Sequence, residues 1–188
     1  FHASRRLDSG GTLPVGLVCA VGDDFREEDF NLLRKAGLNL EGIEIIEGGR
    51  TFRWHGRYEG DMGQAVTIET QQNVLDGYEP KVPAAWWSPR VLFLANNHPS
   101  IQSHVLNQCE GAKFIALDSM NLWINIAFEE LSSVLRRVNM AILNDTEVRM
   151  IAKDENLIRA GESIRDGSAL TGGTESGAGP SILILSLI

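Results

Sequence analysis

The sequence has little cysteine and no cluster of positive charge, and both shortages exclude classes of protein. Two cysteines among 188 residues, Cys19 and Cys109, form neither a C-x-x-C pair nor a zinc-ligand spacing, so we expect reduced thiols in a cytoplasmic protein. The net charge is −8 and Lys and Arg are nowhere concentrated, which argues against broad binding to nucleic acid or to an anionic membrane. An anionic cofactor would therefore need local hydrogen-bond donors or a metal ion.

Three further features are missing. No hydrophobic run approaches the length of a transmembrane helix. No G-x-G-x-x-G follows the first predicted strand, so a dehydrogenase-like dinucleotide domain is a poor interpretation. The chain starts FHASRR, without a Met or a signal-peptide hydrophobic region, and it ends on an uncovered strand, SILILSLI. We therefore expect a chain that is truncated at both ends relative to its gene product.

What is present is the alternation of strands and helices of an α/β protein. Residues 15–21, VGLVCAV, predict a buried strand. The apolar spacing after it predicts a helix with Asp23 or Asp24 as N-cap and Gly37 as its stop, and we interpret both aspartates as structural. With 43% hydrophobic residues the chain can bury a substantial core. Further strands are predicted at residues 91–95, 114–117 and 138–143, and further helices at 99–109, 128–138 and 156–165.

Residues 43–69 interrupt this rhythm with alternating apolar and polar residues around a Gly-Gly pair. The pattern is typical of antiparallel strands with one solvated face, and it predicts a small β-lid inserted in the main domain. Arg53 and Trp54 give the lid a cation and an aromatic ring suited to a sugar or a nucleoside. Cross-strand packing, with Trp54 on one face and Arg53 on the other, explains them equally well without a ligand.

Three predicted strands end in polar residues, namely Asn96, Asp118 and Asn144. Turns favour Asn and Asp, so each ending is ordinary by itself. The carboxyl ends of parallel strands share one edge of the sheet, and open α/β sheets bind their ligands at that edge. We therefore expect the three residues to face one cleft.

The stretch LNDTE places Asn144 and Glu147 where the last of these strands passes into a helix. An amide and a carboxylate three residues apart can reach a hydrated cation or a phosphate group. The alternative is structural, with Asn144 closing a turn and Glu147 favoured by the helix dipole. In either case Asp145 or Thr146 can serve as the N-cap. Because an unpaired Glu is costly to bury, we expect Glu147 to face water or a cation rather than the core.

From about residue 14 to residue 165 the chain resembles the PfkB (ribokinase-like) carbohydrate kinases. The resemblance is carried by PVGLVCAVGDDF, by GGRTFRWHGRY with the later TIET, by ALDSMNLWI and by LNDTE. It implies an α/β fold in which a central, mostly parallel sheet is flanked by helices and carries a small antiparallel β-lid, here as one incomplete domain over residues 1–188. It also implies transfer of the γ-phosphate of ATP to a hydroxyl group of a sugar or nucleoside, with Mg²⁺ as the metal.

The family's motifs imply roles for five residues. Asn144 and Glu147 match its N-x-x-E, which is associated with Mg²⁺ and phosphate placement. Asn96 and Asp118 would contact the substrate from the strand ends, and Arg53 would contact it from the lid. The resemblance also makes a homodimer through the lid an expectation.

Two parts of the family's pattern are absent from this sequence. Its first strand, with a substrate-binding Asp and a Gly-Gly turn, should precede Phe1. Its G-A-G-D segment supplies the base and the anion hole, but residues 177–180 read Gly-Ala-Gly-Pro and precede a strand instead of opening a helix. Phosphoryl transfer needs a group that accepts the hydroxyl proton as well as the metal, so we assign no catalytic residue. We expect a catalytically incomplete fragment of an ATP-dependent kinase; the alternative is a non-catalytic ligand-binding or interaction module that uses the lid and the cleft.

Overall fold

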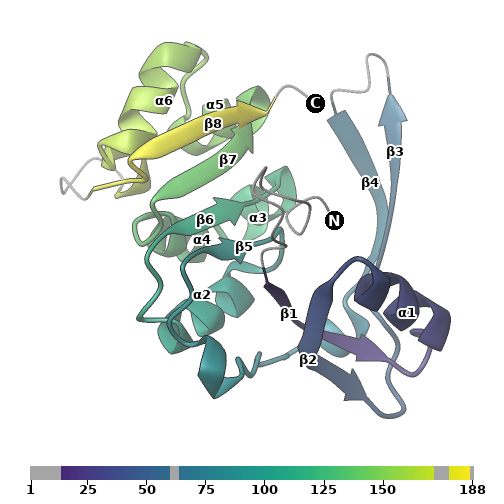
Figure 1. Ribbon diagram of the computed structural model, residues 1–188. Coiled ribbons are helices and arrows are strands. Elements are labelled where there is room, and N and C mark those ends of the chain that lie inside the picture. Colours follow the sequence, from purple (N-terminus) through teal and green to yellow (C-terminus); the bar gives the residue numbers. More distant parts are fainter. Residues whose placement is uncertain (1–13, 60–63, 172–177, 187–188) are drawn as a thin grey trace. The chain divides into compact units, whose positions relative to one another are not determined.

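The computed structural model describes residues 14–59, 64–171 and 178–186, and the chain divides into two compact units, Phe1–Ala84 and Ala85–Ile188. The first unit holds a pair of parallel strands and an antiparallel hairpin, and the second unit holds a parallel sheet of four strands (Figure 1). Among the described residues, no helix combines the length and the hydropathy needed to cross a membrane.

The first unit opens with a β-α-β arrangement. Strand β1 (Val15–Gly22) pairs in parallel with β2 (Leu38–Ile46), and α1 (Glu27–Lys35) connects them. Gly37 follows the helix with a φ of 81°, the left-handed conformation that ends many helices, as predicted. The N-cap prediction was wrong. Arg26 occupies that position and bonds to Asp29, because the two aspartates before it are used by backbone N–H groups across the turn.

The antiparallel hairpin is shorter at its start than the predicted lid. It consists of β3 (Arg53–Glu59) and β4 (Gln64–Gln71), with a bulge between His55 and Gly56, and the 3₁₀ turn η1 (Asn73–Leu75) follows it. Residues 43–46 lie in β2 and pair in parallel with β1. These residues therefore belong to a parallel pair, and the antiparallel strands begin only after the Gly-Gly turn.

The second unit has four parallel strands in sequential order, β5 (Leu92–Leu94), β6 (Ile115–Asp118), β7 (Met140–Asn144) and β8 (Ile182–Ser186). All four were predicted, although β6 and β7 each extend one residue beyond the predicted end. The helix predicted at 128–138 ends at residue 135, and the short helix α3 was not predicted. The remaining elements are η2 (Ala84–Trp86), α2 (Pro99–Gln108), α3 (Asn121–Ile126), α4 (Phe128–Leu135), α5 (Asp145–Ala152), α6 (Leu157–Arg165) and η3 (Ser168–Leu170).

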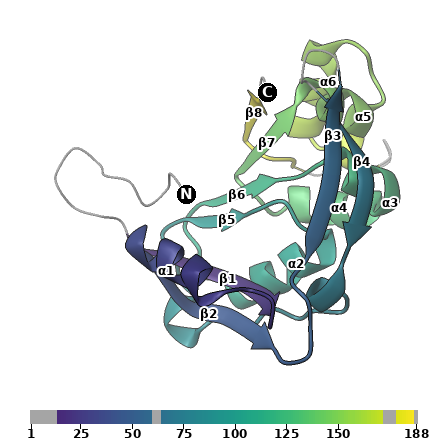
Figure 2. The same cartoon turned by 90° about the vertical axis from the view of Figure 1, so that its right-hand side faces the viewer.

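One face of this sheet carries the core. Strand side chains alternate between the two faces, and the register puts Leu94, Leu117, Ala141 and Leu183 on the same side. The helices lie on that side of the sheet in both views (Figure 1, Figure 2). The buried cluster between them includes Leu117, Leu131, Leu135, Ala141, Leu143, Val148, Ile151 and Ile164.

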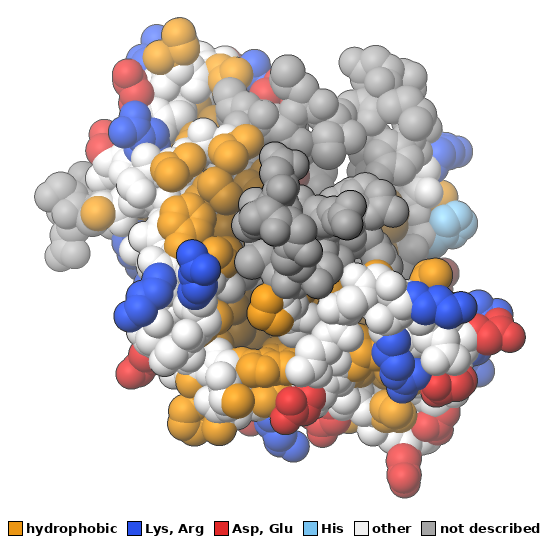
Figure 3. All heavy atoms as spheres, viewed as in Figure 1, with side chains coloured by type: hydrophobic (Ala, Val, Ile, Leu, Met, Phe, Trp, Pro, Cys, Tyr) orange, Lys and Arg blue, Asp and Glu red, His pale blue; other side chains and the backbone are white. Residues whose placement is uncertain are grey.

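The opposite face is apolar and partly open to solvent. Phe93 on β5 is 54% exposed, and Ile182 and Ile184 on β8 are 45% and 44% exposed. Hydrophobic side chains gather over β7 and β8 in the space-filling view (Figure 3). Right-handed crossovers between strands in sequential order put every connecting helix on one side, so the described helices of this unit all lie on the core side.

Candidate functional site at the carboxyl edge of the parallel sheet

The sheet topology brings the predicted strand-end residues to one edge. Asp118 is the last residue of β6 and Asn144 is the last residue of β7, and these two strands are parallel neighbours. Asn96 lies two residues beyond β5, the other neighbour of β6. The three residues therefore share the carboxyl edge of the sheet, as predicted, while the substrate contacts of Asn96 and Asp118 stay predictions.

Asn144 and Glu147 form a reciprocal cap at the start of α5. The Asn144 Oδ1 atom accepts from the Glu147 backbone N–H at 2.9 Å, and the Glu147 Oε2 atom accepts from the Asn144 backbone N–H at 2.8 Å. This is a capping box, which satisfies two N–H groups that a helix start otherwise leaves open. Asn144 is therefore the N-cap, and the prediction of Asp145 or Thr146 at that position was wrong.

The expected exposure of Glu147 was also wrong. Glu147 is only 7% exposed and is one of the buried residues of α5. The expectation assumed that a buried Glu would be unpaired, but the Asn144 N–H supplies one hydrogen bond from within the same motif. The N-x-x-E motif therefore has a structural role as a helix cap. A metal ion at this place would have to share the Glu147 carboxylate with the cap.

Asp118 and Glu147 are two carboxylates in a poorly hydrated place. Burial raises the pKa of Glu147, the Asn144 N–H opposes that shift, and the nearby Asp118 carboxylate raises the pKa further. Burial also raises the pKa of Asp118, against a hydrogen bond from the Ser119 backbone. Two such groups interact unfavourably when both are ionised, so a cation at this edge would stabilise their charged forms.

This pair of carboxylates fits Mg²⁺ in one specific way. Mg²⁺ is usually held by one or two carboxylates, while water and substrate phosphates complete its octahedron. Among the described residues there is no group of three or more His, Cys, Asp or Glu that could hold a metal by itself. Asp118 and Glu147 therefore suit a metal that is shared with phosphate groups and do not form a closed protein cage.

Asn96 is fixed by a residue that the sequence analysis did not single out. Its Oδ1 atom accepts from the Trp123 indole Nε1 at 2.9 Å, and the indole meets the His98 ring edge to face with centroids 5.1 Å apart. Trp123 lies on α3 and is only 3% exposed. Because the carbonyl of Asn96 is occupied, its amide group is the part that can donate to a ligand. The ALDSMNLWI stretch carries part of the family resemblance, but its helix was not predicted.

Gln102 joins two of the strand ends and was also missed. Its side-chain Nε2 donates to the backbone carbonyls of Ala95, at 3.0 Å, and of Asp118, at 3.1 Å. Gln102 is 2% exposed, so these bonds form in the interior. The sequence offered no clear signal, because the predicted helix at 99–109 contains several polar residues and Gln102 does not stand out among them.

Arg53 belongs to the first unit. It lines an open groove of ≈ 510 Å³ on the hairpin, together with Phe52, Trp54, His55, Glu69 and Gln71. Its side chain is 63% exposed and lies 3.5 Å from Asp24.

Trp54 takes part in cross-strand packing. Its ring lies over Gly56, where an added Cβ would be 2.2 Å from the indole, and its Nε1 donates to Thr67 at 3.1 Å. The packing interpretation therefore accounts for Trp54, while Arg53 keeps an accessible guanidinium.

Comparison with known proteins identifies the fold. No family model and no curated protein matches the sequence. The α/β architecture, with its parallel sheet, flanking helices and small antiparallel sheet, is nevertheless the ribokinase-like fold.

Three solved structures show the extent of the likeness. A protein described as ribokinase II from E. coli, in complex with ATP and Mg²⁺, matches with a TM-score of 0.64 and 15% identity over 82% of this chain and 54% of its own. A fructokinase from Halothermothrix orenii matches with a TM-score of 0.63 and 11% identity over 84% of this chain and 59% of its own. A nucleoside kinase from Methanocaldococcus jannaschii matches with a TM-score of 0.59 and 15% identity over 76% of this chain and 47% of its own. This chain thus spans about half the length of these proteins, and at such identities the likeness establishes the fold alone.

Proposed function

We propose that this chain carries the metal and phosphate side of a ribokinase-like kinase. The parent reaction is the phosphorylation of a sugar or nucleoside hydroxyl by ATP in the presence of Mg²⁺, in the cytoplasm. The observation that carries the proposal is the pair of carboxylates, Asp118 and Glu147, at the edge where parallel sheets bind ligands. The fold shared with a fructokinase and a nucleoside kinase supports the class of acceptor.

Each residue of the site has a defined task in this proposal. Glu147 and Asp118 hold the charge that balances a cation, and Asn144 fixes the Glu147 carboxylate through the capping box. Asn96 donates to the substrate from its amide. On the first unit, Arg53 presents a cation at the hairpin groove, and its ligand role is a separate prediction. Mg²⁺, when bound, would neutralise phosphate charge. A homodimer through the hairpin remains a prediction.

The metal assignment is tested with Mn²⁺, a paramagnetic substitute for Mg²⁺. Amide NMR signals near Asp118 and Asn144–Glu147 should broaden when Mn²⁺ and ATP are added to the 188-residue chain, and Mg²⁺ should reverse the broadening. Glu147→Gln keeps the size and the cap but removes the charge, so the broadening should be lost. Asp145→Asn is the matched control, because Asp145 is a neighbouring acid whose carboxylate pairs with Arg149. Broadening that persists in Glu147→Gln or arises elsewhere would overturn the metal site.

The absence of a G-A-G-D segment leads to a second test. In the family that the sequence resembles this segment supplies the base, and residues 177–180 have Pro where its Asp would stand, so ADP release over a panel of sugars and nucleosides should stay at background. A turnover of about one per second, at the low end of typical enzymes, would contradict the proposal that the chain is catalytically incomplete.

A further inference from the structure

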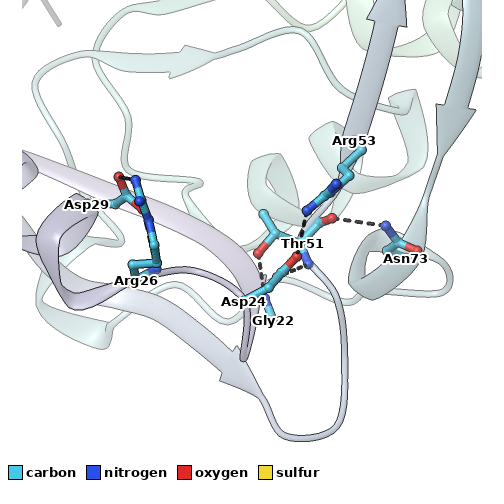
Figure 4. Close-up of polar contacts among 7 residues, drawn as sticks. All are labelled: Gly22, Asp24, Arg26, Asp29, Thr51, Arg53 and Asn73. Atoms are coloured by element: carbon cyan, nitrogen blue, oxygen red, sulfur yellow. Dashed lines mark hydrogen bonds and ion pairs between the residues drawn. The ribbon is translucent and has the colours of Figure 1, made fainter.

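Thr51, at the root of the hairpin, is held through three separate groups (Figure 4). Its backbone N–H donates to the Asp24 Oδ1 atom at 2.7 Å, and its hydroxyl accepts from the Gly22 N–H at 3.0 Å. Its carbonyl accepts from the Asn73 side chain at 3.0 Å. Gly22 and Asp24 lie at the end of β1, and Asn73 follows β4. Both legs of the hairpin are thus tied together, and to β1, at one residue.

The end of β1 packs tightly against the turn that precedes Thr51. A Cβ added at Gly22 would lie 2.4 Å from the Gly49 carbonyl oxygen, so the two backbones touch. Asp23 adds a second clasp by accepting from the Gly48 N–H at 2.7 Å. The turn before Thr51 is therefore fixed against the end of β1.

Asp24 has a second carboxylate oxygen, and it faces Arg53. The Oδ2 atom lies 3.5 Å from the guanidinium of Arg53, the first residue of β3. Asp24 and Arg53 are 29 positions apart along the chain. An exposed ion pair of this kind contributes little to stability, but it selects one orientation of a long side chain. Hydrogen bonds from Thr51, with a smaller contribution from Arg53, hold the pKa of Asp24 below its usual value.

We propose that Asp24 is a positioning residue that fixes the root of hairpin β3–β4 with one oxygen and orients Arg53 at the hairpin groove with the other. The proposal rests on the proposed function only where it gives Arg53 a ligand. Asp24 touches no ligand itself. It acts through the angle of the hairpin and the direction of one guanidinium.

The test separates the two oxygens. Asp24→Ala removes both contacts, whereas Asp24→Asn keeps an acceptor for the Thr51 N–H and removes the charge that faces Arg53. Asp23→Ala is the matched control, because it removes an acceptor at the same turn but touches neither Thr51 nor Arg53. Global stability is followed by urea unfolding in all three variants.

Two readouts need no ligand. In Asp24→Ala, hydrogen exchange of the Thr51 amide and the first amides of β3 should become about five- to tenfold faster, as expected for the loss of one charge-assisted hydrogen bond. Asp24→Asn should restore most of this protection. In both variants the Arg53 Nε–H signal should lose its ordered heteronuclear NOE, and in the wild type added NaCl should do the same. Asp23→Ala should leave the Arg53 signal unchanged.

An Arg53 signal in Asp24→Asn that stays as ordered as in the wild type would overturn the positioning role of the second oxygen. Unchanged exchange of the Thr51 amide in Asp24→Ala would overturn the role of the first oxygen. If Asp24→Ala does not fold, Asp24→Asn still decides the role of the second oxygen. Binding of ribose, fructose and inosine, followed by ligand-observed NMR, adds the functional readout. Asp24→Asn and Arg53→Ala should weaken the same ligand to a similar degree, and the double variant should weaken it no further. Failure of the wild type to bind any of them would refute the ligand role of Arg53, while the ligand-free readouts would still decide the role of Asp24.

Discussion

The burial of Glu147 is made tolerable by the capping box, which gives one of its carboxylate oxygens a hydrogen bond. The Asn144 N–H bonds to Oε2 at the first turn of α5, where the helix dipole also favours a negative charge. Burial still raises its pKa, and Asp118 adds to that shift. The same carboxylate can therefore complete a helix cap and remain poised for a cation, so the structural and the metal interpretations are compatible.

Tyr78 gives a prediction at the scale of a single residue. Its hydroxyl oxygen is buried with no hydrogen-bond partner among the described residues, and burial, followed by the Glu44 and Cys19 charges, raises the pKa of Tyr78 to about 12. Tyr78→Phe removes the unpaired hydroxyl and should raise the free energy of unfolding by roughly 1 kcal/mol near pH 8, measured by urea unfolding.

The sign of the pH effect follows from the raised pKa. Above the ordinary pKa of 10, Tyr78 ionises in the unfolded chain while it stays protonated in the folded chain. The contribution of the protonated Tyr78 to the free energy of unfolding is therefore complete below pH 10, and it is lost as the pH rises toward about 12. Tyr78→Phe should lack this part of the alkaline loss. Parallel losses in the wild type and the variant would show that Tyr78 is not the group concerned.

At the scale of elements, the start of α5 separates capping from metal binding. Asn144→Ala removes the side-chain acceptor of the cap and should lower the free energy of unfolding by about 0.5–2 kcal/mol. Glu147→Gln keeps both hydrogen bonds of the box and should cost less. Urea unfolding of the two variants provides the measurement. A larger loss in Glu147→Gln than in Asn144→Ala would mean that the charge, not the cap, stabilises the helix start.

The elements that the sequence predicted well are those with long apolar runs or strong breakers. The strand at 15–21 and the helix stop at Gly37 follow from buried apolar residues and from the left-handed conformation that glycine permits. The edge shared by Asn96, Asp118 and Asn144 could also be predicted, because parallel strands end together.

Features that depend on distant partners could not be predicted. Asp23 and Asp24 looked like helix caps because they stand a few residues before α1. The backbone N–H groups that donate to them, those of Gly48 and Thr51, come from a turn 25 and 27 residues away. The burial of Glu147 and the clasp of Gln102 likewise depend on neighbours that only the fold brings close. Alternation alone could not separate residues 43–46 from the hairpin, since it does not distinguish parallel from antiparallel pairing.

At the scale of the whole molecule, the first unit holds two sheets of two strands and the second unit holds one sheet of four. The chain spans about half the length of the kinases that share its fold. The parallel sheet of the second unit is covered by helices on one face only among its described elements. All-parallel sheets are normally covered on both faces, so the open apolar face should dominate the solution behaviour of the isolated chain.

This face gives the last prediction. The double variant Ile182→Lys, Ile184→Lys places two charges on the exposed side of β8, where both residues are nearly half exposed. Fluorescence of the dye ANS in the presence of the protein should fall by roughly half, because two of the three most exposed apolar side chains of this face are removed. Concentration-dependent association, measured by light scattering, should fall as well. Since both side chains lie on the face opposite the core, the free energy of unfolding should change by no more than about 1 kcal/mol. Ile158→Lys is the control, because Ile158 is 74% exposed but lies on α6, away from this face, so its dye binding should match the wild type. Equal dye binding in all three proteins would mean that the face is covered in solution.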